Sequence, residues 1–247
     1  MLIVGEMKLS DVIHHDYTLV PVINRFDIKL GFGDGTIEEI CLEKDINLGF
    51  FLTILNTFHD TQYFPKEYLK SFPAEVLIKY LRKAHKSYVE GNIPEIKKMI
   101  EVLLSLSNEN GKTLSLIKNF FEEYSAEFSK HIIREEEVVY PYVLELENLI
   151  DNSKESPLPE EKITNYSISN YEQDHEDIEE KLFDLKNLII KYLHVETSET
   201  LLFEETSYAL LRELFVLEKE LREHSRIEDL ILVPKVEEME KLYKTLT

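Results

Sequence analysis

Apolar residues recur three and four positions apart through most of the chain from about residue 74 onward. This spacing puts the apolar side chains on one face of a helix. Polar, turn-forming stretches at 107–113, 151–161 and 194–200 divide the pattern into four long helical segments. Within the first segment, Asn92 and Glu95 are expected to cap a new turn around a proline. The pattern predicts an all-α fold, an up-down-up-down four-helix bundle.

The beginning of the chain has a different pattern, with short helical stretches broken by the glycine-rich sequence KLGFGDGT at 29–36. The following TIEEICLEKDINLGFFLTILNTF predicts a helix, a turn and a second helix, with Thr36 and Glu39 as a capping box. A stretch with two prolines then has the character of a linker. We expect a small helical N-terminal domain at 1–58, a linker at 59–73 and the bundle at 74–247.

The charge and cysteine content narrow the classes of function. The 48 acidic residues outnumber the 28 basic ones, for a net charge of −20, and no basic stripe is present. Nucleic acid and anionic membranes are therefore not expected as partners. The longest apolar run, LGFFLTIL at 48–55, is too short to span a bilayer. A single cysteine, Cys41, excludes an intrachain disulfide and favours a reducing compartment. A soluble, cytoplasmic protein is expected.

Each predicted bundle helix contains one histidine of a nearly regular series. The series is His85, His131, His175 and His224, with spacings of 46, 44 and 49 residues. In antiparallel helices, such spacings bring the four imidazoles to nearly the same height, within about 3–5 Å along the bundle axis.

Two of these histidines belong to a repeated motif, His-x-x-x-Glu-x-x-x-x-x-Pro. It occurs as HIIREEEVVYP from residue 131 and as HSRIEDLILVP from residue 224. Glu135 and Glu228 therefore stand four residues after a histidine, on the same helix face. The prolines are expected to mark where each helix bends or ends beyond the site.

A simpler interpretation has to be weighed against a metal site. In so acidic a chain, about one histidine in five has an acidic residue four positions later from composition alone, as His175 has with Glu179. A lone pair of this kind is more often a solvated helix face. Four evenly spaced histidines with a repeated motif favour the metal site instead. A ferritin-like site needs Glu-x-x-His twice, and only Glu172 and His175 form it.

Four imidazoles and two carboxylates are a donor set for a pair of transition-metal ions. Imidazole suits Zn, Cu and Fe, and a carboxylate can bridge two ions. A histidine-rich dinuclear iron centre is the expected occupant, with iron, manganese or a mixture left open. Contact of Glu172 or Glu179 with the metals is also left open. The remaining histidines, His14, His15, His59 and His194, are interpreted as surface or satisfied polar groups, and Tyr140 as aromatic core packing.

These motifs resemble a known family. The segment from about 75 to 243 is similar to a hemerythrin-like four-helix domain, and the whole chain resembles the Repair of Iron Centers family of di-iron proteins. The motifs HKSYVEGNIPEI, HIIREEEVVYP, QDHED and HSRIEDLILVP carry the resemblance. It implies two non-haem iron ions, with four histidine ligands and two bridging carboxylates. By that matching the ligands are His85, His131, His175 and His224, bridged by Glu135 and Glu228.

The N-terminal domain departs from that family. Its usual turn carries a Cys-Cys pair, and here Gly31 and Phe32 stand at those positions, while Cys41 is retained in the following helix. Phenylalanine supplies no thiolate, and one cysteine cannot cycle through an intramolecular disulfide. A redox or nitrosyl-handling role of the cysteine pair therefore does not transfer to this chain.

Three functional hypotheses remain. The resemblance implies a role in iron–sulfur cluster repair and in nitrosative and oxidative stress defence, with NO, O₂ or peroxide as small ligands and damaged iron–sulfur proteins as partners. The alternative is a non-catalytic protein that senses or binds O₂ or NO. The third is a structural bundle without metal. A homodimer is a further expectation from the family, and whether the protein is an enzyme is left open.

Overall fold

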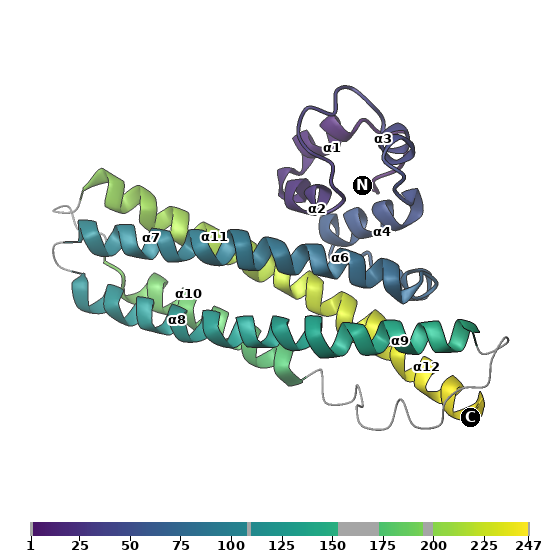
Figure 1. The fold of residues 1–247 in the computed structure, drawn as a ribbon. Helices are drawn as coiled ribbons and strands as arrows, with labels where there is room; N and C mark the ends of the chain where they lie inside the picture. The colour runs from purple at the N-terminus through teal and green to yellow at the C-terminus, as the bar shows by residue number, and fades with distance from the viewer. Residues whose placement is uncertain (1, 108–109, 153–172, 195–199, 247) are drawn as a thin grey trace.

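The computed structural model describes residues 2–107, 110–152, 173–194 and 200–246. These ranges are almost entirely helical and contain no β-strand, so the all-α prediction is confirmed. Figure 1 shows a long helical bundle with a group of short N-terminal helices on one side of it, beside α6. None of the helices in these ranges combines the length and apolar content that crossing a membrane requires.

The bundle consists of four helical runs, three of them assembled from shorter elements. The first run is α6 (Ala74–Ser87), the π-helical turn η2 (Tyr88–Asn92) and α7 (Ile93–Leu106). The second is α8 (Gly111–Arg134), the π-helical turn η3 (Glu135–Val139) and α9 (Tyr140–Asn152). The third is α10 (Gln173–Tyr192). The fourth is α11 (Leu201–Ile227), the π-helical turn η5 (Glu228–Leu232) and α12 (Val233–Leu246).

A proline follows each of the three π-helical turns by two residues: Pro94, Pro141 and Pro234. Proline has no N–H, and its ring clashes with the carbonyl four residues earlier. In each case that carbonyl lies inside the π-helical turn, whose wider backbone relieves the clash and lets the helix continue. The expectation that Asn92 caps a new turn is therefore wrong, because Asn92 has helical dihedral angles and makes no capping bond.

The N-terminal helices are α1 (Leu9–His15), the 3₁₀ turn η1 (Tyr17–Leu19), α2 (Val20–Asn24), α3 (Ile37–Glu43) and α4 (Leu48–His59). A further short helix, α5 (Lys66–Lys70), forms within the stretch expected to be a linker. The predicted capping box is present, with Thr36 N donating to Glu39 Oε2 at 2.9 Å and Glu39 N donating to Thr36 Oγ1 at 3.2 Å. The assignment of 1–58 and 74–247 to separate domains stays a prediction.

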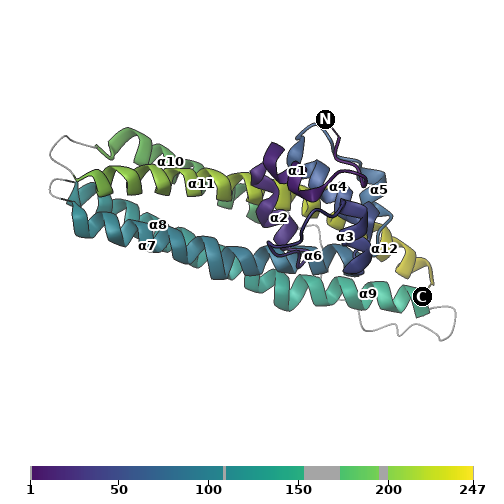
Figure 2. The ribbon, with the colours of Figure 1, turned by 90° about the horizontal axis from the view of Figure 1, so that it is seen from above.

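Two clusters of buried apolar side chains form the core of the described structure. The first, here called the module core, joins the N-terminal helices to the start of α6, to α9 and to α12. The second, here called the bundle core, fills the space between α7, α8, α10 and α11. On α6 the module core ends at Leu81 and the bundle core begins at Ala84. The view from above in Figure 2 shows the N-terminal helices over the end of the bundle that the module core occupies.

A buried ion pair fixes the N-terminal helices to the bundle. Arg25, directly after α2, donates through Nη2 to the carboxylate of Glu220 on α11 and through Nη1 to the hydroxyl of Tyr80 at 3.1 Å. The guanidinium carbon also lies 5.4 Å from the ring centroid of Tyr88. Both charged side chains are almost completely buried, at 2% and 7% exposure. This contact ties the N-terminal helices to the segment of α11 that immediately precedes His224.

Candidate metal centre

Four of the predicted ligands converge at one buried point between the two cores. His85, Glu135, His224 and Glu228 each place one ligand atom so that all four atoms lie within 4.8 Å of one another. All four side chains are buried, with relative exposures between 0% and 6%. Two imidazoles and two carboxylates buried at one point cost free energy unless they are paired or coordinate a metal. The donor set is therefore that of a cation site.

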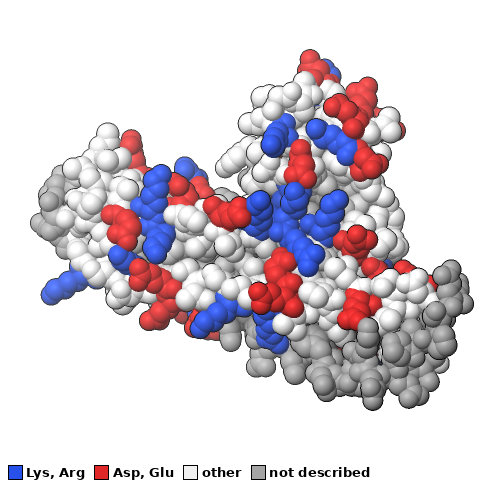
Figure 3. Space-filling view, viewed as in Figure 1, with Lys and Arg blue, Asp and Glu red and all other residues white. Residues whose placement is uncertain are grey.

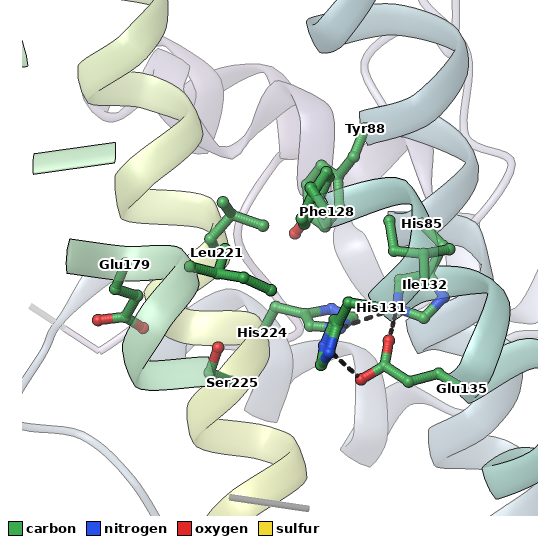
Figure 4. A pocket seen from close by; sticks show the side chains of 11 residues that line it. His85, Tyr88, Phe128, His131, Ile132, Glu135, Glu179, Leu221, His224 and Ser225 are labelled. Carbon is green, nitrogen blue, oxygen red and sulfur yellow. Dashed lines mark hydrogen bonds and ion pairs between the residues drawn. The ribbon is translucent and has the colours of Figure 1, made fainter. Parts of the chain in front are cut away.

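Glu135 occupies the central position in this cluster. One of its carboxylate oxygens lies 3.0 Å from His85 Nε2, and the other lies 2.8 Å from His131 Nε2. Figure 4 shows the carboxylate between the two imidazoles. A carboxylate with one oxygen directed at each of two histidines is suited to bridging two metal ions.

His224 and Glu228 complete the cluster from the fourth helical run. His224 Nε2 lies 3.1 Å from Glu228 Oε2 and 3.1 Å from His85 Nε2. The ring of Tyr88 packs edge-on against His224, with the ring centroids 5.7 Å apart. The two repeats of the motif thus supply one His/Glu pair each, and His85 lies between the pairs.

The structure brings together five of the six residues predicted as ligands, and their role as ligands stays a prediction. His175 lies in α10, but its side chain is outside the described part of the structure, as is all of Glu172. Glu179, one turn after His175, lines a small cavity beside the cluster. Figure 4 shows Glu179 on the α10 side of that cavity.

The cavity has a volume of about 20 Å³, and His85, His131, Glu135 and His224 form part of its wall. The apolar part of the wall includes Phe128, Leu221 and Ile178. A volume of this size holds about one water-sized molecule. The cavity therefore has room for a ligand of about the size of a water molecule or a diatomic gas.

The π-helical turns explain how the carboxylates reach this point. Glu135 and Glu228 are each the first residue of such a turn, and the proline of the motif lies six residues later. The expected bend at the prolines is thus a local widening of the helix directly at the ligands. π-Helical turns occur often at functional sites, because they change the direction of side chains within an otherwise regular helix.

Glu136 orients His85, and sequence reasoning missed it. Its Oε1 accepts from His85 Nδ1 at 2.9 Å, and its Oε2 accepts from Arg82 Nε at 2.9 Å. Burial raises the pKa of Glu136, but the hydrogen bonds and charges of His85 and Arg82 outweigh it and hold the pKa below its usual value. A carboxylate on Nδ1 fixes the ring and leaves Nε2 directed at the cluster. Arg82 stands three residues before His85, on the same helix face, so both side chains reach the one carboxylate of Glu136. This three-residue spacing is the signal in the sequence for the contact.

Glu136→Gln is expected to weaken metal binding by about 10–100-fold, because glutamine keeps an acceptor near His85 Nδ1 but loses the negative charge. The measurement is metal affinity by competition with a chromophoric chelator. Glu137→Gln, an exposed neighbour in the same turn, is the matched control. Equal affinities in the two variants would show that Glu136 does not act on the site.

Tyr140 is buried in the core, as expected, but its hydroxyl also belongs to the site. The hydroxyl donates to Glu228 Oε1 at 2.6 Å, and the ring stacks on His85 at a centroid distance of 5.5 Å and an interplanar angle of 9°. Burial, with the nearby carboxylates, raises the pKa of Tyr140 well above its usual value. Tyr140 is therefore a neutral hydrogen-bond donor that holds one oxygen of Glu228.

The two buried histidines respond in opposite directions to their surroundings. Burial lowers the pKa of His85, but hydrogen bonds to Glu135 and Glu136 and the charges of Glu135 and Glu228 outweigh burial and raise it to about 9. Burial dominates for His224 and lowers its pKa, despite the nearby Glu228. At neutral pH and without metal, His85 is protonated and His224 is neutral.

Metal affinity is therefore expected to rise by about tenfold per pH unit from pH 7 until it levels off near pH 9. A metal ion needs the deprotonated Nε2 of His85, and the work of removing the proton falls as the pH approaches the pKa. His224 adds nothing to this slope, because it is already neutral. Chelator competition at three pH values measures the slope. An affinity that does not change over this range would contradict protonation of His85.

The other histidines do not join the cluster. His14, His15 and His194 are exposed, and the partly buried His59 pairs through Nδ1 with Asp16 at 2.7 Å within the N-terminal helices. These positions agree with their interpretation as surface or satisfied polar groups.

A helical bundle that holds a buried cluster of histidine and glutamate side chains is typical of helical cation-binding proteins. The family described as Hemerythrin HHE cation binding domain matches residues 94–236, more than half of the sequence, and the chain belongs to this family. No curated protein matches the chain. His85 lies before the matched range, and the structure places it in the same cluster as the matched residues.

Proposed function

We propose that this chain is a di-iron protein of the Repair of Iron Centers type, which serves iron–sulfur cluster repair and defence against nitrosative and oxidative stress in the cytoplasm. The observation that carries the proposal is the convergence of His85, Glu135, His224 and Glu228 within 4.8 Å. His131 and His175 complete the proposed ligand set for two iron ions. NO, O₂ or peroxide are the proposed small ligands, and damaged iron–sulfur proteins are the proposed partners.

The donor set fits non-haem iron. Imidazole suits iron as well as zinc and copper, carboxylate suits harder ions such as manganese, and iron is compatible with both kinds of ligand; an all-oxygen set would instead favour magnesium or calcium. Cys41 is remote from this role, because it is buried in the N-terminal helices and burial raises the pKa of its thiol to about 11. A bound iron pair supplies the electron-transfer chemistry that NO, O₂ and peroxide require.

Residues next to the predicted metal ligands form hydrogen bonds that fix the orientation of those ligands. Glu136 fixes His85 through Nδ1, and Tyr140 holds Glu228 through Oε1. The apolar wall formed by Phe128 and Leu221 limits water near the ligands. In a repair reaction iron is also the cargo, and protonation of Glu135 or Glu228 would weaken their hold on iron and favour its release.

The test is reactivation of a damaged enzyme. A purified [4Fe–4S] dehydratase is inactivated with NO and incubated anaerobically with the iron-loaded chain, with activity and NO consumption followed over time. We expect recovery of dehydratase activity beyond that given by an equal amount of free ferrous iron. Fully loaded protein that neither consumes NO nor restores activity would refute the repair function.

One observation favours a second candidate, a non-catalytic protein that binds or senses O₂ or NO. The cavity of about 20 Å³ accommodates a diatomic ligand and little else. Gly31 and Phe32 stand where the family has its cysteine pair, so the redox or nitrosyl-handling role of that pair is lost, which favours a binding protein over a repair protein. Reversible O₂ binding over repeated cycles would support this candidate, whereas multiple turnovers of NO would exclude it. Light scattering tests the proposed homodimer for either function.

A further inference from the structure

A second, larger cavity lies between the N-terminal helices and α6, and none of the predicted metal ligands lines it. Its volume is about 470 Å³, which is within the range of small-molecule binding sites. One wall of this groove is a single face of α6, formed by Val76, the adjacent pair Lys79 and Tyr80, and Lys83, so that each side of the pair is three or four residues from the next lining residue.

The opposite wall comes from two turns of the N-terminal helices. Residues 25–27, after α2, and residues 44–47, between α3 and α4, line the groove together with Phe50. Each turn contains an aspartate with a left-handed backbone, Asp27 at φ 60° and Asp45 at φ 54°. These are the two non-glycine residues with positive φ in the described part of the chain. Such conformations cost free energy and concentrate at functional sites.

The floor of the groove is aromatic. The ring of Phe26 lies 5.5 Å from that of Tyr80 and 5.9 Å from that of Phe50, centroid to centroid. Phe50 and Tyr80 are themselves 6.1 Å apart in an edge-to-face arrangement. Three rings in mutual contact, two of the pairs edge to face, form an apolar floor, which suits the apolar part of a ligand.

The rim of the groove is basic, although the chain is strongly acidic. Four cationic side chains line the groove against two carboxylates, in a protein with a net charge of −20. Lys83 already pairs with Asp27, at 2.9 and 3.1 Å, and Arg25 with Glu220. Lys44 and Lys79 are exposed on opposite walls. Figure 3 shows basic side chains gathered where the N-terminal helices meet the bundle.

The start of α4 adds a partial positive charge to the groove. Asn47 is the N-cap of this 12-residue helix and lines the groove. The first turn of a helix carries backbone N–H groups without helical partners and a partial positive charge. Together with Lys44 and Lys79, it forms an environment that favours an anion.

We propose that this groove binds a small organic anion, a molecule with an apolar body and a carboxylate, phosphate or sulfonate group. The apolar body packs on Phe26, Phe50 and Tyr80, and the anionic group lies between Lys44 and Lys79. None of the predicted metal ligands lines the groove, so this proposal does not rest on the proposed function.

The experiment uses the fluorescent probe 8-anilinonaphthalene-1-sulfonate, which has both features, with the full-length chain. We expect one saturable site per chain with enhanced, blue-shifted emission. Lys44→Glu/Lys79→Glu removes the charge complement and is expected to weaken binding by about tenfold or more. Val76→Trp fills the groove without changing its charge and is expected to weaken binding similarly. Circular dichroism and thermal melting verify that each variant is folded.

The matched control is Lys97→Glu/Lys112→Glu, which makes the same change of charge at exposed lysines of the bundle outside the groove. This variant is expected to bind the probe as the wild type does. Absence of saturable binding to the wild type would overturn the proposal, as would equal weakening in the control. Weakening by the charge change but not by Val76→Trp would also overturn it, because it would place the probe on the surface. Inorganic phosphate at the same concentration is expected not to displace the probe, and displacement would show that the apolar floor is not used.

Discussion

Replacing both Glu135 and Glu228 with glutamine is expected to reduce the bound metal from about two ions per chain to essentially none. Glutamine has nearly the size of glutamate, so the helices retain their packing, but its neutral amide is a poor metal ligand. The two carboxylates are the only charged ligands in the predicted set, and both are completely buried. Their charge therefore accounts for a large part of the affinity of the site.

The measurement is metal content per chain after anaerobic purification and after titration with ferrous iron. Glu137→Gln/Glu237→Gln is the matched control, because it removes two exposed carboxylates from the same two helical runs. Full metal content in the control and none in the site variant is the expected result. Two ions per chain retained by the site variant would place the metals elsewhere.

Arg25→Met is expected to destabilise the protein by about 3–5 kcal/mol, because it leaves the carboxylate of Glu220 buried without its counter-charge. This is a large part of the total stability of a typical domain, about 5–15 kcal/mol. The measurement is the free energy of unfolding in urea. Loss of the pair also removes the polar contact of Arg25 with Tyr80.

The double variant Arg25→Met/Glu220→Met is expected to recover most of the lost stability, because two apolar side chains of similar volume fill the same space without a buried charge. Lys70→Met is the control, since it breaks a contact between α5 and the bundle, with the exposed Glu238 on α12. That change is expected to cost less than about 1 kcal/mol. Equal losses for Arg25→Met and Lys70→Met would contradict a special role for the buried pair.

The architecture of the bundle could be predicted because helical periodicity is a local property of the sequence. The even spacing of the histidines then predicted their common height, and His85, His131 and His224 do meet. The pairs His131/Glu135 and His224/Glu228 followed from the four-residue interval alone.

Other features depend on contacts between distant residues and could not be predicted in this way. Glu136 binds His85 across two helical runs, and Tyr140 reaches Glu228 across 88 positions of sequence. Arg25 appears in sequence as an ordinary surface arginine, and its burial against Glu220 follows only from the docking of the N-terminal helices. The π-helical turns were missed because each proline was expected to mark a bend or an end of its helix, whereas the helix continues past it through a π-helical turn.

The position of the metal centre between the two hydrophobic cores has a consequence for how the protein opens. The two separate cores predict two units that open independently in the absence of metal, each with its own pattern of amide hydrogen exchange. The ligands straddle the boundary: on α11, His224 lies between Leu221 of the bundle core and Ile227 of the module core. Opening of either unit disperses the ligands, so bound metal opposes both openings by mass action. Metal binding therefore joins two units that could open separately into one cooperative unit.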